Sequence, residues 1–136
     1  MKSFKFKSAL VVLFLSTTLI ACSNDDDKEV SNGTTKVAFA TEVKGPETGK
    51  VNEELSYDVI FTPDNACGEF FKFTEATIGT EKGMQIAVKY PTGVCTTQVP
   101  SPQKAVYKFK SATKGTFDIK FKKSETEFIS AKVVIE

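Results

Sequence analysis

Histidine and arginine are both absent from this 136-residue chain, so that all 18 basic residues are lysines. Without histidine, the chain lacks the usual general base at neutral pH and the commonest protein ligand of transition metals. Without arginine, it lacks the planar group that binds phosphate or carboxylate through two hydrogen bonds. The motifs G-x-S-x-G and H-E-x-x-H are absent too. These absences predict a protein that is no enzyme and that holds no cofactor or metal.

Tryptophan is also absent, and the aromatic residues are twelve phenylalanines and three tyrosines. The formal net charge is +1 and the lysines are spread along the chain, so no basic surface for nucleic acid is expected. Hydrophobic residues make up 40% of the sequence, enough for one domain with a real core. Valine, isoleucine, phenylalanine and threonine are common, which favours strands over helices.

The first 21 residues have the organisation of a secretory signal peptide. Residues 1–7, "MKSFKFK", carry three lysines, and residues 8–21, "SALVVLFLSTTLIA", form an uncharged and mostly apolar run. A permanent membrane-spanning helix needs about 20 apolar residues, and this run is shorter. A basic start, a short apolar run and a small residue at its end predict export.

Residues Leu19, Ile20, Ala21 and Cys22 resemble the lipobox of bacterial lipoproteins. The resemblance implies that the Cys22 thiol receives a diacylglyceryl group, that signal peptidase II cuts before it, and that the new amino terminus is acylated. Two or three acyl chains anchor a protein firmly in a membrane, whereas one gives marginal binding. The alternative is ordinary secretory cleavage with Cys22 left as a spare thiol.

The residues after the cysteine are polar and acidic: Ser23, Asn24, Asp25, Asp26 and Asp27. A serine in the first position disfavours retention at the inner membrane. The stretch is similar to the export signal of surface-exposed lipoproteins in Bacteroidota. That similarity implies an outer-membrane protein that faces the cell exterior. The alternative is a solvated tether that leaves the protein facing the periplasm, since such residues cannot bury enough surface to fold.

Three regions are therefore expected: a signal peptide at 1–21, an acidic flexible tether at 22–35 and one domain at 36–136. In the domain, apolar and polar residues alternate, as in "TFDIKFK" at 116–122, and turn-forming residues separate the runs. About seven short strands predict an antiparallel immunoglobulin-like β-sandwich, with a small closed barrel as the alternative. "EFFKF", at 69–73, is apolar on both faces and is expected in the middle of the sandwich.

Cys67 and Cys95 are the only cysteines in the predicted domain. Because exported proteins meet an oxidising compartment, the two thiols are expected to pair. The bridge would close a loop of 29 residues, worth about 3.5 kcal/mol in the chain-entropy treatment. The nearby Asp64, Asn65 and Glu69 offer oxygen ligands for calcium, but their spacing is not that of an EF-hand and favours a turn.

The segment "YPTGVCTTQVPSPQ", residues 90–103, is the candidate interaction loop. Its prolines restrict their neighbours to extended conformations, and the disulfide would hold it in place. An extended, tethered segment is what a substrate-like protease inhibitor presents. The alternative, which we favour, is a connection between the two sheets in which proline blocks edge-to-edge pairing. The candidate residues of the loop are Val94, Thr96, Thr97, Gln98, Val99 and Pro100.

Four lysines are expected on the outward faces of adjacent strands: Lys108, Lys110, Lys120 and Lys122. They could bind an acidic glycan, but solvated faces of alternating strands need polar residues in any case. The leading hypothesis is a membrane-anchored, non-catalytic binding or structural module whose partner is a protein or a glycan. The competing hypothesis is a protease inhibitor that acts through residues 94–100.

Overall fold

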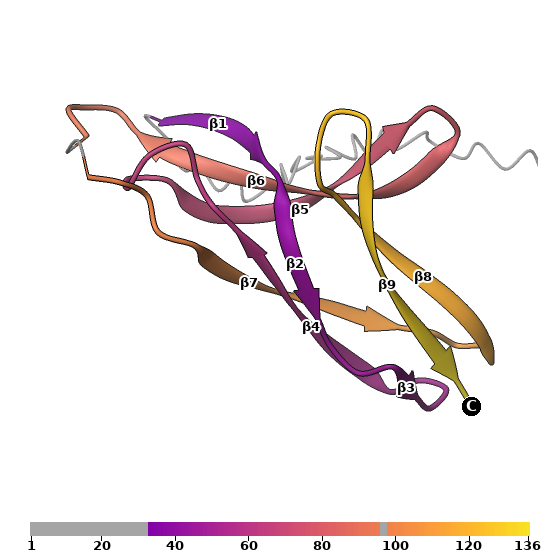
Figure 1. The fold of residues 1–136 in the computed structure, drawn as a ribbon. Helices are drawn as coiled ribbons and strands as arrows, with labels where there is room; N and C mark the ends of the chain where they lie inside the picture. Colours follow the sequence, from indigo (N-terminus) through magenta and orange to yellow (C-terminus); the bar gives the residue numbers. More distant parts are fainter. Residues whose placement is uncertain (1–32, 96–97) are drawn as a thin grey trace, which may run out of the picture.

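The computed structural model describes residues 33–95 and 98–136, and these residues form strands and loops without any helix. Nine strands make two sheets that pack face to face (Figure 1). The predicted antiparallel β-sandwich is confirmed, with nine described strands in place of about seven, and the two separate sheets exclude the closed barrel. The signal peptide predicted at 1–21 lies outside the described residues.

The strands are β1 (Gly33–Ala38), β2 (Ala40–Lys44), β3 (Thr48–Gly49), β4 (Glu54–Phe61), β5 (Glu69–Ile78), β6 (Glu81–Pro91), β7 (Gln103–Lys110), β8 (Gly115–Lys122) and β9 (Phe128–Ile135). The larger sheet has the order β1-β6-β8-β9-β3, with β5 paired to β6, and the smaller sheet has the order β2-β4-β7. Pairing is antiparallel except between β3 and β9 and between β6 and β8. In Figure 1, β5 and β6 run at an angle to β8 and β9.

"VAF" at 37–39, with Val43 beyond it, predicts one strand, but these residues are divided between the two sheets. Residues before Phe39 pair with β6 as β1, and residues after it pair with β4 as β2. β1 also begins at Gly33, inside the segment 22–35 predicted as a tether. Its side chains there are polar, so the strand is defined by backbone pairing with β6 and leaves no hydrophobic pattern in the sequence.

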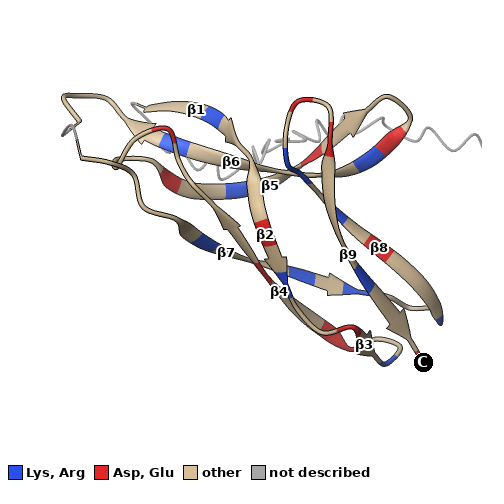
Figure 2. Ribbon diagram, viewed as in Figure 1, with Lys and Arg blue, Asp and Glu red and all other residues tan. Residues whose placement is uncertain are grey.

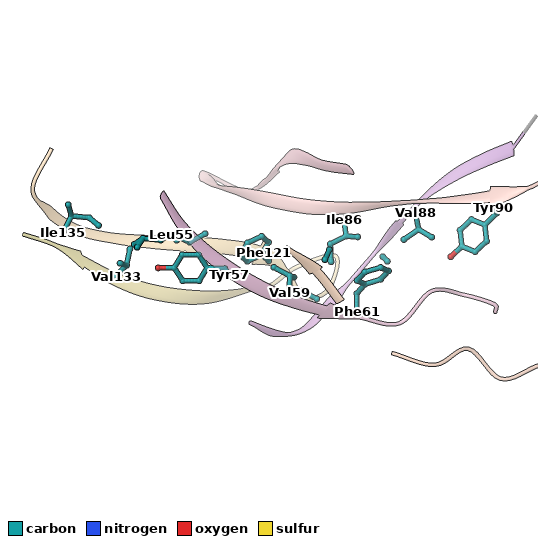
Figure 3. Packing of buried hydrophobic residues seen from close by; sticks show 14 residues of the cluster. Leu55, Tyr57, Val59, Phe61, Ile86, Val88, Tyr90, Phe121, Val133 and Ile135 are labelled. Atoms are coloured by element: carbon teal, nitrogen blue, oxygen red, sulfur yellow. The ribbon is translucent and has the colours of Figure 1, made fainter. Parts of the chain in front are cut away.

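The apolar side chains of the alternating runs, such as Phe117, Ile119 and Phe121, point inward as their period of two predicts, and they meet in one core between the sheets (Figure 3). The largest completely buried side chains are Tyr57, Val59, Phe61, Ile86, Val88, Phe121, Val133 and Ile135. The rings of Phe73, Tyr107 and Phe121 pack with centroids 5.2–5.7 Å apart. Because the three residues come from three different strands, this cluster joins the two sheets.

The expectation that residues 69–73 lie in the middle of the sandwich is wrong. They begin β5, which pairs only with β6 and is an edge strand of the larger sheet. A register shift between Phe70 and Lys72 marks a β-bulge, which places an extra residue in the strand. Phe70 packs inward, 6.3 Å from Phe61 between ring centroids, while the Phe71 ring lies beneath the ammonium groups of Lys72 and Lys89. An edge strand can carry partly exposed phenylalanines of this kind, because one of its sides stays open to solvent.

Tyr57 is a polar side chain at the centre of the core. Its ring is completely buried, and its hydroxyl donates a hydrogen bond of 2.8 Å to the carbonyl oxygen of Pro46. A side chain at Gly45 would collide with the Tyr57 ring, so glycine is required where the chain passes over it. Burial raises the pKa of Tyr57 above its ordinary value of 10.0. The tyrosine therefore holds the β2–β3 connection against the core in its neutral form.

Tyr57→Phe is expected to lower the free energy of unfolding by about 1 kcal/mol at pH 8, because the hydrogen bond to Pro46 is lost. The raised pKa of Tyr57 adds a pH dependence in the wild type. The contribution of Tyr57 to stability is complete below pH 10 and is lost as the pH rises toward the folded-state pKa, because only the unfolded chain ionises readily. Between pH 8 and pH 10.5, the free energy of unfolding measured in urea should fall less in the variant than in the wild type.

Tyr107→Phe is the matched control for this experiment. Tyr107 is also in the aromatic cluster, but its hydroxyl makes no hydrogen bond among the described residues. The control should change stability by less than about 0.5 kcal/mol. The role given to the Tyr57 hydroxyl would be contradicted if the free energy of unfolding of Tyr57→Phe fell as much as that of the wild type between pH 8 and pH 10.5.

Candidate functional site

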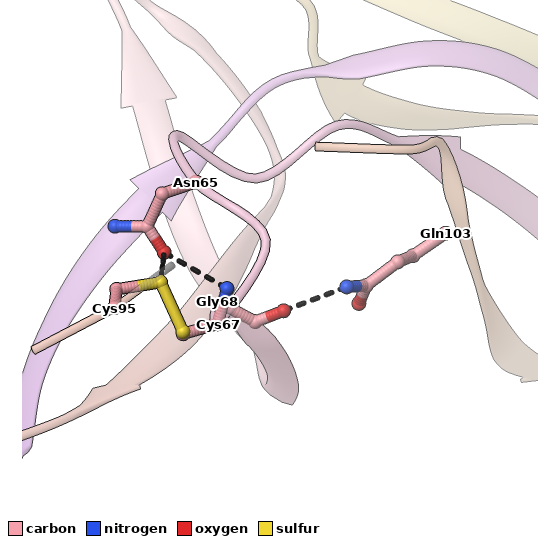
Figure 4. Close-up of a disulfide and its surroundings, with 5 residues drawn as sticks. All are labelled: Asn65, Cys67, Gly68, Cys95 and Gln103. Carbon is pink, nitrogen blue, oxygen red and sulfur yellow. Dashed lines mark hydrogen bonds between the residues drawn. A yellow bond between two sulfur atoms is a disulfide. The ribbon is translucent and has the colours of Figure 1, made fainter. Parts of the chain in front are cut away.

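Cys67 and Cys95 form a disulfide, as predicted, with an S–S distance of 2.10 Å and Cα atoms 6.0 Å apart (Figure 4). Cys67 lies in the connection between β4 and β5, and Cys95 lies in the connection between β6 and β7. The bridge therefore joins two loops at one end of the sandwich. We call this the loop end, and it comprises residues 62–71, residues 91–95 and residues 98–103.

Asn65 organises the first of these loops. Its side-chain oxygen accepts a hydrogen bond of 3.0 Å from the Cys67 N–H, and its carbonyl accepts one of 3.1 Å from the Gly68 N–H. The same side-chain oxygen lies 3.4 Å from Sγ of Cys95, a contact without a proton because both sulfur atoms are oxidised. Asn65 thus forms the predicted turn.

Two of the three groups considered for calcium, those of Asp64 and Asn65, have other partners. The Asp64 carboxylate pairs with the Lys36 ammonium at 3.1 Å, and Asn65 is engaged in the turn. No group of three or more His, Cys, Asp or Glu residues suited to a metal ion occurs in the described part of the chain. The geometry supports the turn and gives no support to a calcium site.

Two further hydrogen bonds hold the base of the loop end. The Asp64 N–H donates to the Tyr90 hydroxyl at 2.8 Å, and the Gln103 side-chain amide donates to the Gly68 carbonyl at 2.6 Å. Gly68 is buried so closely that a Cβ there would lie 2.6 Å from Cβ of Pro63. Segment 92–102 is thus held at its start by the disulfide and at its end by Gln103. The role of Gln103 could not be predicted from the sequence, since its partner is a backbone atom 35 residues away.

The candidate interaction loop projects from this base. Val94 and Val99 are almost completely exposed, at 103% and 89%, Gln98 is exposed and Pro100 is half-buried. Thr96 and Thr97 lie outside the described residues. Residues 91–103 carry no charge, and Figure 2 shows this loop in the neutral colour at one end of the molecule. The structure therefore presents an uncharged segment with two apolar side chains in solvent.

The four lysines considered for glycan binding do not form one surface. Lys108 and Lys110 belong to the smaller sheet, whereas Lys120 and Lys122 belong to the larger one. The expectation that their strands are adjacent is wrong, because β7 and β8 are consecutive in sequence but lie in different sheets. Three of the four form ion pairs: Lys108 with Glu54, Lys120 with Glu81 and Lys122 with Glu125. The ion pairs support the interpretation of charge-balanced faces, but the Lys122 side chain is only 13% exposed, so the expectation of a solvated position is wrong for this residue.

Two concave regions were not foreseen from the sequence. A groove of about 700 Å³ lies between the β2–β3 connection and β9, and its lining includes Val43, Tyr57 and Lys132. A smaller cleft of about 300 Å³ has an apolar floor that includes Met84 and Phe117. The groove is lined by residues of β2, β4 and β9 and of the β2–β3 connection, and the cleft by residues of β5, β6, β7 and β8.

Comparison with models of known protein families, with curated protein sequences and with solved structures gives no match for this chain. Among the described residues, no helix has the length and apolar character required to cross a membrane. The predicted lipidation site, Cys22, and the predicted export signal, Ser23 to Asp27, lie outside the described residues. The geometry of the loop end is therefore the main structural observation that bears on function.

Replacing Cys67 and Cys95 together by alanine is expected to lower the free energy of unfolding by about 3.5 kcal/mol, because the unfolded chain gains the freedom of the opened loop. Chemical unfolding of the variant, and of the wild type with reductant, should show similar destabilisation. As a control, Gln103→Ala removes one hydrogen bond at the same place and should cost about 1 kcal/mol. Labelling of two free thiols in the unreduced, unfolded domain would refute the bridge.

Proposed function

We propose that this protein is a lipid-anchored lipoprotein of the outer membrane whose β-sandwich serves as a non-catalytic binding or structural module. The observation that carries the binding role is the loop end, where exposed Val94 and Val99 project from a base held by a disulfide and hydrogen bonds. The anchor is Cys22. The module faces the cell exterior, with the periplasmic face as the alternative.

The case for the anchor starts from the amino-terminal sequence. A basic start, a short apolar run and the Leu19–Cys22 motif together resemble a lipoprotein signal peptide. The Cys67–Cys95 disulfide supports export independently, because such bridges persist in oxidising compartments and are rare in the cytosol. Acyl chains on Cys22 would then hold the domain at the membrane surface.

The case for binding rests on preorganisation. A segment that is already ordered loses less conformational entropy when a partner binds it, and this improves affinity. The disulfide, the Asn65 turn and the Gln103 hydrogen bond order the base of the loop before any partner arrives. Exposed valines offer apolar area to a partner at little cost in side-chain entropy. The partner belongs to the protein or glycan class.

A protease inhibitor that acts through residues 94–100 is the second candidate. The exposure of Val94, Gln98 and Val99 favours it, since a protease cleft needs an accessible segment. Pro91, Pro100 and Pro102 restrict the backbone on both sides of the segment. A substrate-like loop held in this way would enter a protease active site and resist release after cleavage.

The anchor is tested by Cys22→Ala. The variant should leave the membrane fraction and appear in soluble fractions, because the thiol that would carry the lipid is gone. Cell fractionation and mass measurement of the purified protein detect this change. The control is Cys67→Ala with Cys95→Ala, which should keep the lipid. Membrane attachment that persists in Cys22→Ala would refute the anchor.

The orientation is tested in the same cells by changing Asp25, Asp26 and Asp27 to alanine. The wild type should be accessible to added protease and antibody on intact cells, and the variant should be hidden. If the wild-type protein is already hidden, we would conclude that it faces the periplasm and that the aspartates serve only as a tether.

The inhibitor candidate predicts a stable complex with at least one protease of a broad panel. Thr97→Ala or Gln98→Ala should abolish inhibition, because these side chains lie in the segment that would occupy the active site. Val134→Ala, at an exposed position on β9, is the matched control and should leave inhibition unchanged. Absence of inhibition across the panel would remove this candidate and leave the binding module, whose partner should be retained in a pull-down.

A further inference from the structure

One edge of β9 is only partly covered by a neighbouring strand. On one side, β9 pairs with β8 along its whole length, from Phe128 to Ile135. On the other side it pairs with β3, and only at Val134 and Ile135. No other strand of the described residues pairs with β9. The part of this edge from Phe128 to Lys132 therefore has no partner strand in the described part of the chain, and we call it the open edge of β9.

The contact with β3 shows which backbone groups face the open edge. The N–H of Val134 donates a hydrogen bond of 2.9 Å to the carbonyl oxygen of Glu47. Successive residues of a strand direct their backbone polar groups to opposite sides, so the groups of Ser130 and Lys132 face the same side as those of Val134. The open edge thus presents the N–H and carbonyl groups of Ser130 and Lys132 in the spacing of a β-ladder.

Pro46 explains why the chain itself does not cover these groups. Proline has no N–H to contribute to a ladder. The Pro46 carbonyl oxygen accepts the hydrogen bond from the Tyr57 hydroxyl, which holds the β2–β3 connection against the core. The chain therefore joins the edge of β9 only from Glu47 onward, where β3 lies beside the end of β9 (Figure 1).

The open edge lines a groove that has room for a further strand. The groove has a volume of about 700 Å³, with Ser130, Ala131 and Lys132 of β9 and Val43 of β2 among its lining residues. Ser130 and Lys132 are exposed, whereas Val43 and Ala131 are half-buried. Natural sheets usually shield their edges, and an accessible edge beside a groove is where an extended peptide can add a strand.

The charges of the groove are balanced. Its charged lining residues are Lys44, Glu47 and Lys132. Lys44 pairs with Glu42 at 2.9 Å, and the register places Lys132 opposite Asp118 of β8. Each lysine therefore has an acidic neighbour, so that the affinity for a ligand would come from backbone hydrogen bonds more than from charge.

We infer that the open edge of β9 binds an extended peptide of a partner protein, which adds a strand to the larger sheet in line with β3. The backbone of the peptide bonds to Ser130 and Lys132. Every second side chain of the peptide points toward Val43 and Ala131, which favours aliphatic residues at these positions. This site is separate from the loop end, and it depends neither on the lipid anchor nor on the loop.

A second copy of the chain suits this edge less well than a peptide. Antiparallel pairing of two copies centred on Ser130 would place residue 126 of one copy opposite Val134 of the other. Residue 126 lies in the β8–β9 hairpin, and β3 already occupies the position beside Val134. The hairpin of each copy would therefore meet β3 of the other, whereas the end of a short peptide meets no such obstacle.

Amide hydrogen exchange of the full-length protein tests whether the edge is open. After correction for intrinsic rates, the amides of Ser130 and Lys132 should exchange at least about ten-fold faster than those of Ala131 and Val133, which face β8. Slow exchange at Ser130 and Lys132 would overturn the inference. If dilution then accelerates the exchange, a second copy covers the edge, and if it does not, another segment of the same chain does.

The binding probe is a fluorescein-labelled hexapeptide of alternating threonine and valine. The full-length protein should bind it in a fluorescence anisotropy titration. Two further peptides carry N-methyl groups either on the threonine amides or on the valine amides, so that each lacks the N–H donors of one side. One of them should bind like the parent peptide and the other at least about five-fold more weakly, because one side alone bonds to β9. Equal affinities of the two, or no binding of the parent peptide, would contradict strand addition.

Ser130→Pro removes one N–H from the open edge and keeps the ladder with β8, since this N–H points away from β8. The variant should bind the parent peptide at least about five-fold more weakly. Ser130→Ala keeps the N–H and is the matched control, with unchanged affinity. Unfolding curves establish whether Ser130→Pro is folded. If it is not, the N-methyl peptides test the same hydrogen bonds on the wild type.

A folded Ser130→Pro variant that binds the peptide as tightly as the wild type would also rule out the site. Val94→Ser with Val99→Ser changes the loop end and should leave peptide binding unchanged. If this double variant loses the peptide instead, the peptide binds at the loop end and the open edge of β9 is not its site. Failure at the open edge therefore leaves the proposed role of the loop end to be tested separately.

Discussion

Every second side chain of β4 is buried between the two sheets. These side chains form a layer around which the other strands are placed. Tyr57, Val59 and Phe61 have no exposed surface. They face residues of β6, β8 and β9 in the other sheet, so each sheet covers the apolar face of its neighbour (Figure 3). The burial of apolar area is the main force that stabilises such a core. Tyr57 adds the one buried hydroxyl whose hydrogen bond ties the β2–β3 connection to this layer.

The loop end is stabilised in a different way. Val94 and Val99 are exposed there, so burial of these side chains cannot hold the loop. The disulfide and the hydrogen bonds made by Asn65 and Gln103 order it instead. A covalent bridge is suited to this task, because it restricts the unfolded chain without requiring a larger core. The outcome is a loop end that is ordered at its base and that exposes Val94 and Val99 to solvent.

The fold class, the inward faces of the main strands and the pairing of Cys67 with Cys95 could all be predicted from the amino-acid sequence. These features depend on local alternation or on the small number of cysteines, which can be read without knowing the pairing of strands. The sequence did not predict that β5 is an edge strand, that β1 and β2 belong to different sheets, or that β7 and β8 do too; these features became clear from the three-dimensional structure. The same holds for the hydrogen bond from Gln103 to Gly68. The physical reason is that strand neighbours are chosen by contacts between distant segments, and a period of two residues indicates which side chains point inward but not which strand lies beside them.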